Sequence, residues 1–365
     1  MSDRPDNEAS APPARPRRIL VVVPSWVGDA VMATPALRMV RRAFPGAFIG
    51  LLVRPGIDQV LAGLDVADEV HVERASGVMG PKFVAAKVRP RRYDSALLLT
   101  NSFSTALIAR IAGIPRRIGY ARDLRSMLLT QTLEPPRTLA GAFAPVPAVE
   151  YYRTIARELV ALGAQPIAEL APRLELVATE SDLASARGVM ERAGLADREP
   201  VAVLNPGGNR DEKRWPADRF ARLGLWLRDT FGVRVLVNGS PGERELCGAI
   251  ARDAGAISLP EMGITLGALK GLLSGALVAP RAMVTNDTGP RHVAQALGVP
   301  VVTMFGPTDH RWTTLPVRED APERILLADP TLPEDLVADE HPERCRVDRI
   351  QEEDVRAAVS AIIRR

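Results

Sequence analysis

An acidic side chain stands where the first strand pattern of this chain turns into its first helix pattern. Asp29 closes the run Pro-Ser-Trp-Val-Gly-Asp at 24–29, which follows the apolar segment 19–23 and precedes a helical pattern over 30–40. Ligands of open α/β sheets bind at such junctions, so the Asp29 carboxylate is placed to contact a ligand. Asp is also a favoured N-cap residue, and position alone leaves both roles open.

A second junction of this type spans 285–294. Thr288 or Asp287 can cap the following helix, Pro290 suits its first turn, and Gly289 lets a ligand approach the backbone. Exposed N–H groups and the helix dipole favour a phosphate at such a point. Because Asp287 would repel phosphate, we expect it to bind a ribose hydroxyl, a sugar hydroxyl or nearby backbone.

A lysine stands out in the segment 206–216, which follows the apolar run 201–204. The chain contains 43 Arg and four Lys residues, so Arg serves where any positive charge suffices. The retained Lys213, beside Arg214, therefore indicates that a compact ammonium group is needed.

Four segments, at 24–29, 206–216, 285–294 and 301–308, together resemble the ADP-heptose:lipopolysaccharide heptosyltransferases of glycosyltransferase family 9. The first run and Asn101 to Phe103 are most similar to the heptosyltransferase II branch. The resemblance extends from about Arg18 to the last helix pattern. Two departures concern the substrate: 207–209 reads Gly-Gly-Asn in place of Gly-Ala-Glu, and 290–291 reads Pro-Arg in place of an apolar pair.

The resemblance implies an inverting glycosyltransferase that moves L-glycero-D-manno-heptose from ADP-heptose to the inner core of a lipopolysaccharide precursor, a Kdo-lipid A that already bears heptose. Asp29 would deprotonate the acceptor hydroxyl, and Lys213 would stabilise the departing ADP. The implied donor-binding residues are Asn209 at the phosphate, Glu243 at the ribose, Met262 at the adenine, and Asp287, Thr288, Gly289 and His292. The implied acceptor-binding residues are Asn101, Ser102 and Ser104.

Several of these residues also have purely structural interpretations. Glu243 can stabilise a helix N-terminus, Met262 can fill a core, and His292 can be a structural hydrogen-bonding residue. No Asp-x-Asp motif occurs, so we expect neither a metal nor another cofactor. The alternatives to a heptosyltransferase are a glycosyltransferase with another nucleotide-sugar donor, a nucleotide-sugar epimerase, and a non-enzymatic nucleotide-sugar-binding protein.

Strand and helix patterns alternate along the chain, which is typical of doubly wound parallel sheets. The expected strands lie at 19–23, 48–53, 69–72, 95–99, 117–119, 201–204, 233–238, 256–258, 282–285 and 301–305. We expect an α/β protein of the GT-B architecture, with two Rossmann-like domains facing across a cleft. Its parts would be a disordered tail at 1–17, an acceptor-binding domain at 18–178, a nucleotide-sugar-binding domain at 179–345, and a helix at 346–365 that packs back across the cleft.

The amino-acid composition of the chain limits where we expect the protein to reside and which partners we expect it to bind. The 365 residues contain no apolar run of 18 and no h-region before residue 18, so we expect neither a membrane-spanning helix nor a signal peptide. Two isolated cysteines, Cys247 and Cys345, fit a reduced cytoplasm, where we expect a monomer. Basic residues from Lys82 to Arg125 can contact anionic lipid at the inner membrane or simply form a solvated surface. Nucleic acid is disfavoured because aromatic residues make up only 4%.

Overall fold

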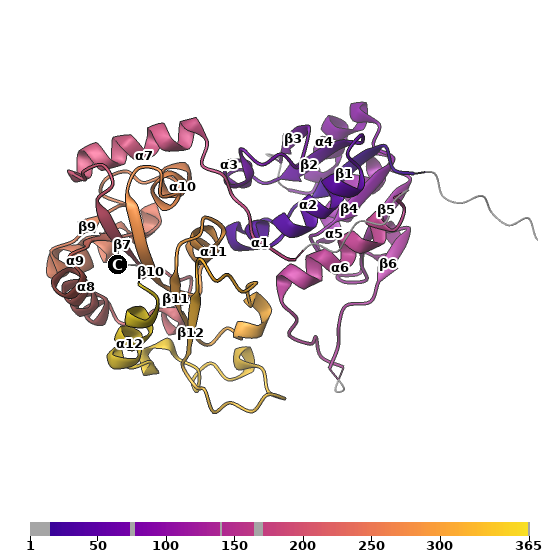
Figure 1. The fold of residues 1–365 in the computed structure, drawn as a ribbon. Coiled ribbons are helices and arrows are strands. Elements are labelled where there is room, and N and C mark those ends of the chain that lie inside the picture. The colour runs from indigo at the N-terminus through magenta and orange to yellow at the C-terminus, as the bar shows by residue number, and fades with distance from the viewer. Residues whose placement is uncertain (1–14, 74–76, 139–140, 164–170, 364–365) are drawn as a thin grey trace, which may run out of the picture.

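The computed structural model describes residues 15–73, 77–138, 141–163 and 171–363. Two six-stranded sheets, each covered by helices on both faces, form two α/β domains that lie side by side (Figure 1). All strand pairs within the two sheets are parallel, as the alternating pattern predicts. The expected tail at 1–17 lies mostly outside the described residues.

The first sheet has the order β3-β2-β1-β4-β5-β6. Its strands are β1 Arg18–Val22, β2 Phe48–Val53, β3 Glu69–Val72, β4 Ser95–Leu98, β5 Arg116–Tyr120 and β6 Gln131–Leu133. Its helices are α1 Val27–Met32, α2 Thr34–Ala43, α3 Ile57–Leu61, α4 Gly80–Val88, α5 Phe103–Ile111 and α6 Ala148–Val160, with 3-10 turns η1 Arg89–Arg91 and η2 Ser126–Leu128. Alternate residues of β1 point to opposite faces. Ile19 and Val21 pack with α1, α2 and α6, whereas Leu20 and Val22 pack with α4 and α5.

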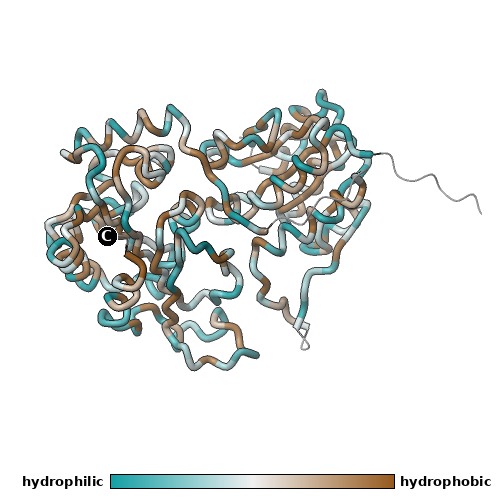
Figure 2. The backbone as a smooth tube through the Cα atoms, viewed as in Figure 1, coloured by the Kyte–Doolittle hydropathy of each residue, from teal (hydrophilic) through white to brown (hydrophobic). Residues whose placement is uncertain are grey.

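The second sheet has the order β12-β11-β10-β7-β8-β9. Its strands are β7 Pro200–Asn205, β8 Arg234–Val237, β9 Ile257–Ser258, β10 Ala279–Asn286, β11 Val301–Phe305 and β12 Glu323–Leu327. Its helices are α7 Glu180–Ala193, α8 Ala217–Phe231, α9 Arg244–Ala254, α10 Leu266–Leu273, α11 Gly289–Ala296 and α12 Glu352–Ile362. The 3-10 turns are η3 Asp211–Lys213, η4 Pro241–Glu243, η5 His310–Thr313, η6 Ala338–Glu340 and η7 Val347–Arg349. Hydrophobic segments follow the strands of both sheets (Figure 2).

The two domains share apolar packing and a buried ion pair. One hydrophobic cluster runs from α1, α2 and α6 into α7, α10 and α11. Beside it, the fully buried Lys270 of α10 pairs with Asp182 of α7 at 2.9 Å and donates to the carbonyl oxygen of Gln59 in the first domain at 2.9 Å. A buried ammonium needs such partners, so this contact stabilises one domain arrangement.

The C-terminal helix differs from the expectation. Helix α12 packs on the second sheet beside α8 and does not lie across the cleft (Figure 1). Its apolar face, formed by Val355, Val359 and Ile362, belongs to the core of the second domain. That hydrophobic face is therefore already buried within the domain that carries it.

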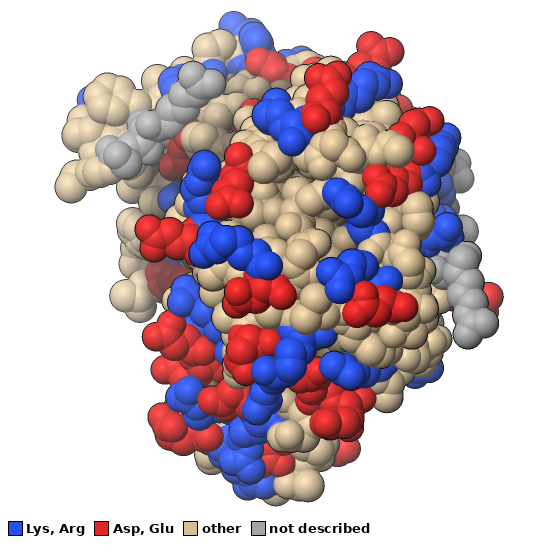
Figure 3. Space-filling view, turned by 90° about the vertical axis from the view of Figure 1, so that its left-hand side faces the viewer, with Lys and Arg blue, Asp and Glu red and all other residues tan. Residues whose placement is uncertain are grey.

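The outer face of the second domain carries basic and acidic side chains interspersed with one another (Figure 3). Among the described residues, no helix is long and apolar enough to span a membrane.

Candidate functional site

Three neighbouring strands of the second sheet end in buried asparagines: Asn205 on β7, Asn238 after β8 and Asn286 on β10. The Asn205 amide donates to the hydroxyl oxygens of Thr285 at 3.0 Å and Thr288 at 2.8 Å, and it accepts from Asn238 Nδ2 at 2.7 Å. Because buried polar groups need partners, this network fixes the carboxyl edge of the sheet. The repeated Asn at strand ends was a sequence signal for these residues, which the motif search missed.

A pocket of about 610 Å³ opens above this network, and we call it the cleft pocket. The first domain contributes Trp26, Val27 and Gly28 to its lining, and the second contributes the loops after β7 and β8 and the starts of α10 and α11. Trp26 is 76% exposed and presents an aromatic surface at the cleft. The pocket lies within the size range of cofactor and ligand sites.

A glycine loop forms one wall of the cleft pocket. Asn286 Nδ2 donates to the carbonyl oxygens of Pro206 at 2.8 Å and Gly207 at 3.0 Å. A Cβ atom on Gly207 would lie 2.4 Å from Glu243 Oε1, so this position admits only glycine without rearrangement. The next polar residue, Asn209, is exposed and lines the pocket.

Glu243 also lines the cleft pocket, and its carboxylate is held by the local backbone. Its Oε1 accepts from Gly208 N at 3.1 Å, and its Oε2 accepts from the Ser240 N and Oγ atoms, both at 2.8 Å. Ser240 and Glu243 form a capping box at η4. The structural interpretation of Glu243 is therefore realised, and its expected contact with a ribose stays a prediction.

Met262 is not among the residues that line the cleft pocket. It is partly buried against the shared core, and its carbonyl oxygen accepts from Arg192 Nε at 2.9 Å. The apolar wall is instead formed by Ile264, Leu266 and Leu269, next to the N-cap residue Thr265. The apolar wall of the cleft pocket thus comes from residues that follow Met262 by a few positions, after the turn between β9 and α10.

Asp29 lies in the first turn of α1, where Trp26 occupies the N-cap position. The Tyr152 hydroxyl of α6 donates to Asp29 Oδ1 at 2.9 Å. Burial raises the pKa of Asp29, and the negative charge of Asp287 raises it further, whereas the Tyr152 bond opposes the rise. Burial and the neighbouring Asp29 hold the pKa of Tyr152 well above its usual value, so Tyr152 remains a donor. Asp29 and Asp287 therefore interact electrostatically across the domain boundary, where α1 packs on α11.

Lys213 lies in η3 and interacts electrostatically with Asp287. Burial lowers its pKa, and the negative charge of Asp287 counters that effect. The buried Trp215 anchors the segment because its Nε1 donates to the Ile350 carbonyl oxygen at 2.9 Å. Asp287 thus interacts electrostatically with both Lys213 and Asp29, and all three were predicted from the sequence.

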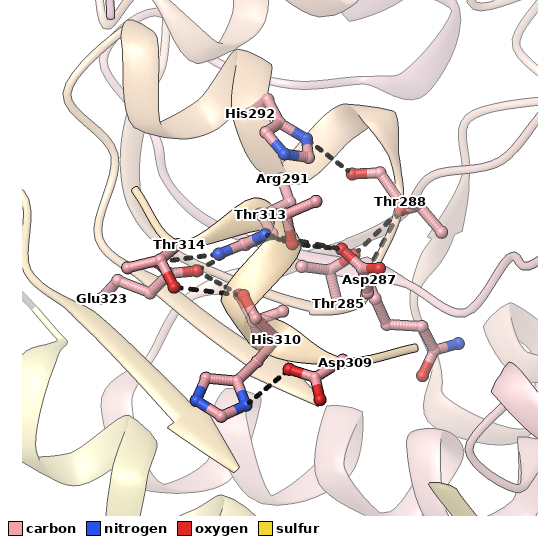
Figure 4. Close-up of polar contacts among 12 residues, drawn as sticks. Thr285, Asp287, Thr288, Arg291, His292, Asp309, His310, Thr313, Thr314 and Glu323 are labelled. Carbon is pink, nitrogen blue, oxygen red and sulfur yellow. Dashed lines mark hydrogen bonds and ion pairs between the residues drawn. The ribbon is translucent and has the colours of Figure 1, made fainter. Parts of the chain in front are cut away.

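Asp287 is held by a buried network that Figure 4 shows. Arg291 Nη1 lies 3.4 Å from Asp287 Oδ1, and the Thr313 hydroxyl donates to the same oxygen at 3.5 Å. The fully buried Arg291 also forms a two-bond pair with Glu323, at 2.6 and 3.1 Å. Burial raises the pKa of Asp287, whereas Arg291 and Lys213 lower it. The sequence singled out Arg291 as a departure but did not indicate its partner Glu323.

His292 lies at the domain boundary, where its ring is 97% buried. Its Nδ1 lies 3.3 Å from the Thr288 carbonyl oxygen (Figure 4), and its Nε2 has no hydrogen-bond partner among the described residues. Burial and the charge of Arg291 lower the pKa of His292 to about 3, so the ring is neutral at physiological pH. A Cβ atom on Gly28 would lie 2.7 Å from Nδ1 of this ring, so His292 packs directly on the backbone of α1.

Two more expected donor residues, Thr288 and Gly289, begin α11 at the cleft pocket. Thr288 is the N-cap residue, although its hydroxyl bonds Asn205 and not the helix backbone. A Cβ atom on Gly289 would lie 3.2 Å from the Cβ atom of Val27 in the first domain. The helix N-terminus therefore meets α1 through two residues without side chains, Gly28 and Gly289.

The expected acceptor residues lie at the carboxyl end of β4, outside the lining of the cleft pocket. Asn101 Oδ1 accepts from the Tyr151 hydroxyl and from Arg125 Nη2, each at 3.2 Å. Ser102 and Ser104 share a hydrogen bond of 2.7 Å between their hydroxyls. The adjacent Tyr151 and Tyr152 of α6 thus contact Asn101 and Asp29. They are two of the four tyrosines in the chain, and nothing in the sequence links them to Asn101 and Asp29.

Similarity to known proteins extends over most of the chain. The family model of glycosyltransferase family 9 (heptosyltransferase) matches residues 84–331. A lipopolysaccharide heptosyltransferase 2 from Escherichia coli (strain K12) is 28% identical over 315 residues, covering 81% of this chain and 84% of the relative.

Two solved structures share the fold. A glycosyl transferase family 9 structure from Veillonella parvula superposes with a TM-score of 0.81 at 22% identity, covering 95% of this chain and 97% of the other. The E. coli heptosyltransferase WaaC with ADP-2-deoxy-2-fluoro heptose gives a TM-score of 0.66 at 20% identity, covering 94% and 99%. These matches confirm the expected two-domain α/β architecture of the GT-B type.

Proposed function

Because this chain belongs to glycosyltransferase family 9 and is a glycosyltransferase, we propose that it transfers a heptose from an ADP-heptose donor to a lipopolysaccharide precursor. The observation that carries this proposal is the packing of α1, which bears Asp29, on α11, which follows Asp287, beside the cleft pocket; Asp287 interacts electrostatically with Asp29 and with Lys213. The names of the relatives support it, since one is a lipopolysaccharide heptosyltransferase 2 and one solved structure holds an ADP-heptose analogue. The donor sugar is L-glycero-D-manno-heptose, and the acceptor is a Kdo-lipid A that already bears heptose.

The second domain binds the nucleotide sugar in the cleft pocket. The N-terminus of α11 offers a positive dipole end to the diphosphate, and Gly289 there has no side chain to block its approach. Asn209 and Glu243 line the same pocket and are positioned for the phosphate and the ribose. Asp287, which Arg291 holds in place, accepts a hydrogen bond from a donor hydroxyl.

The first domain supplies the base. Burial and the charge of Asp287 make Asp29 more basic than an exposed aspartate. The hydrogen bond from Tyr152 to Oδ1 orients the carboxylate. The acceptor hydroxyl gives its proton to Asp29 as its oxygen forms a bond to the anomeric carbon. The bond from that carbon to the ADP oxygen breaks on the opposite side, which inverts the anomeric centre. Lys213 stabilises the negative charge that develops on ADP.

The test of this function is transfer by Asp29→Asn, with ADP-heptose and a heptosylated Kdo-lipid A as substrates. We expect transfer to fall by about 10²–10⁴, the usual contribution of a general base, with ADP affinity within a few-fold of the parent. The matched control is Asp58→Asn, because Asp58 also lies in a first helical turn but, among the described residues, accepts only from the nearby Gly56 N. Near-normal turnover by the Asp29 variant would refute the base assignment. Failure of ADP-heptose to stabilise the protein, in a thermal-shift panel of nucleotide sugars, would refute the donor.

A further inference from the structure

Positive charge is concentrated in one part of the first domain. Residues 77–130 contain ten Lys and Arg residues but only two acidic residues, whereas the whole chain has a net charge of +3. The remainder of the chain is therefore net negative. The outer face of the second domain, where both signs alternate, provides the contrast (Figure 3).

The same segment exposes large apolar side chains. Of the ten exposed large hydrophobic residues among those that the structure describes, six lie within 77–130: Val78, Met79, Phe83, Phe103, Leu124 and Met127. Val78 is 98% exposed and Leu124 is 87% exposed, although the sheet has core space on both faces. Exposed apolar residues that gather in one place mark a surface that meets another surface.

These residues lie on adjoining elements over one face of the first sheet. Helix α4 contacts α5, and α5 contacts η2, on the face opposite to α1 and α6 (Figure 1). Val78 precedes α4, Phe103 begins α5, and Leu124 follows β5, so all three lie toward the carboxyl edge of the sheet. That edge also carries Asn101, where the proposed acceptor residues lie.

The backbone before η2 holds Leu124 outward. Asp123 and Leu124 have φ angles of 52° and 58°, in the left-handed region that residues other than glycine seldom adopt. Two such residues in succession persist where a local shape is required. The apolar side chain of Leu124 is exposed in this turn.

The charge pattern points to a membrane as the partner. Helices α4 and α5 and the turn η2 contain no acidic residue, and the exposed Lys82 and Lys87 lie beside Phe83 on α4. Apolar side chains that enter the lipid boundary, with ammonium groups above them, match the surface of an anionic bilayer. The nearby Asn101 then lies within reach of a glycolipid headgroup held in that bilayer.

We propose that these elements dock the first domain on an anionic phospholipid bilayer. The surface, which we call the docking face, comprises Val78, Met79, Lys82, Phe83, Lys87 and Leu124. Docking presents the carboxyl edge of the first sheet to the membrane-embedded acceptor. Only the identity of that acceptor rests on the proposed function.

The test is flotation of the full-length chain with vesicles of phosphatidylethanolamine and phosphatidylglycerol, and with vesicles of phosphatidylcholine alone. We expect binding to the anionic vesicles, weakened by added salt, and little binding to phosphatidylcholine. The triple variant Val78→Ser, Phe83→Ser, Leu124→Ser should reduce the bound fraction by about tenfold or more. Lys82→Glu with Lys87→Glu should remove the preference for anionic vesicles. The matched control is Val317→Ser, because Val317 is 96% exposed but lies on the second domain.

Activity measurements separate this proposal from the proposed function. The triple variant should transfer heptose to a delipidated, water-soluble acceptor at the parental rate, yet transfer poorly to acceptor embedded in vesicles. Parental binding by the triple variant, or an equal loss with Val317→Ser, would overturn the docking face. Self-association of the parent that the triple variant abolishes, with no vesicle binding, would assign the surface to a second copy of the chain and overturn it as well. Absence of transfer to either acceptor would refute the proposed function and leave the flotation result to decide the docking.

Discussion

Replacing Tyr152 by Phe removes one hydrogen bond from the proposed base and little else. The Tyr152 hydroxyl donates to Asp29 Oδ1 at 2.9 Å, and the ring is 93% buried in the shared core, where Phe retains its packing. A hydrogen bond to a charged group contributes about 1.5–3 kcal/mol, and one pKa unit corresponds to about 1.4 kcal/mol. Loss of this bond should therefore move the acidic limb of the pH–rate profile upward by about one to two pH units.

The sign follows from the groups around Asp29. Burial and Asp287 raise the pKa of Asp29, and the Tyr152 bond counters them by stabilising the carboxylate. Without that bond, Asp29 stays protonated to a higher pH, and a protonated carboxyl cannot accept the acceptor's proton. We expect kcat/KM to fall on the acidic side and to recover toward the parental plateau at alkaline pH.

The assay is the initial rate of heptose transfer as a function of pH, with kcat/KM taken at each point. Tyr93→Phe is the matched control, because Tyr93 is also a buried tyrosine but bonds His71 Nε2 at 2.7 Å. An acidic limb that stays in place in Tyr152→Phe, in a protein with the parental melting temperature, would refute the role of this bond. A limb that moves downward would refute the electrostatic reasoning altogether.

Three further predictions test the rest of the site. Lys213→Ala should lower kcat strongly in the transfer assay, and Lys213→Arg should restore little of it because the guanidinium is larger and planar; full activity with Arg would show that any cation suffices. The product should have an inverted anomeric centre by NMR, and retention of configuration would contradict the direct displacement. Activity should survive excess EDTA, because Lys213 and the N-terminus of α11 carry the diphosphate charge; inactivation that Mg²⁺ reverses would contradict this metal-free site. Gly28→Ala should impair transfer from ADP-heptose, because the added Cβ would lie 2.7 Å from His292 Nδ1. Parental KM and kcat values in this variant would show that the two domains separate freely at this point.

Ten of the twelve strands in the two sheets follow from the sequence, because a buried parallel strand is an uninterrupted apolar run that one window reveals. The edge strands β6 and β12 were not predicted, since both are only partly buried and include polar residues. Helix ends were less predictable. Thr179, Ser181 and Asp182 are all residue types that can cap α7, but Thr179 is the N-cap and forms a capping box with Asp182. Several polar residues in a row can each cap a helix, and only the packing of the helix selects one of them.

Some residues of the candidate site could also be predicted from the sequence, whereas others could not. Asp29, Lys213 and Asp287 are identifiable because each follows a strand and carries a charge where the chain turns. Tyr152, which bonds Asp29, and Glu323, which pairs with Arg291, are not, because each lies on another element, and contact between distant elements leaves no mark in a single sequence. Burial of an arginine such as Arg291 becomes intelligible only once its partners are known.

The geometry of the proposed reaction depends on the domain boundary as much as on the charged residues. Asp29 belongs to α1, whereas Asp287 immediately precedes the N-terminus of α11, so their separation is set by how closely these two helices approach. Gly28 and Gly289 permit that approach, since a side chain at either position would meet the opposite domain. A nucleotide bound at the N-terminus of α11 would contact both sides of the same boundary. Donor binding and placement of the base are therefore coupled through two glycines, and a change at either should alter KM and kcat together.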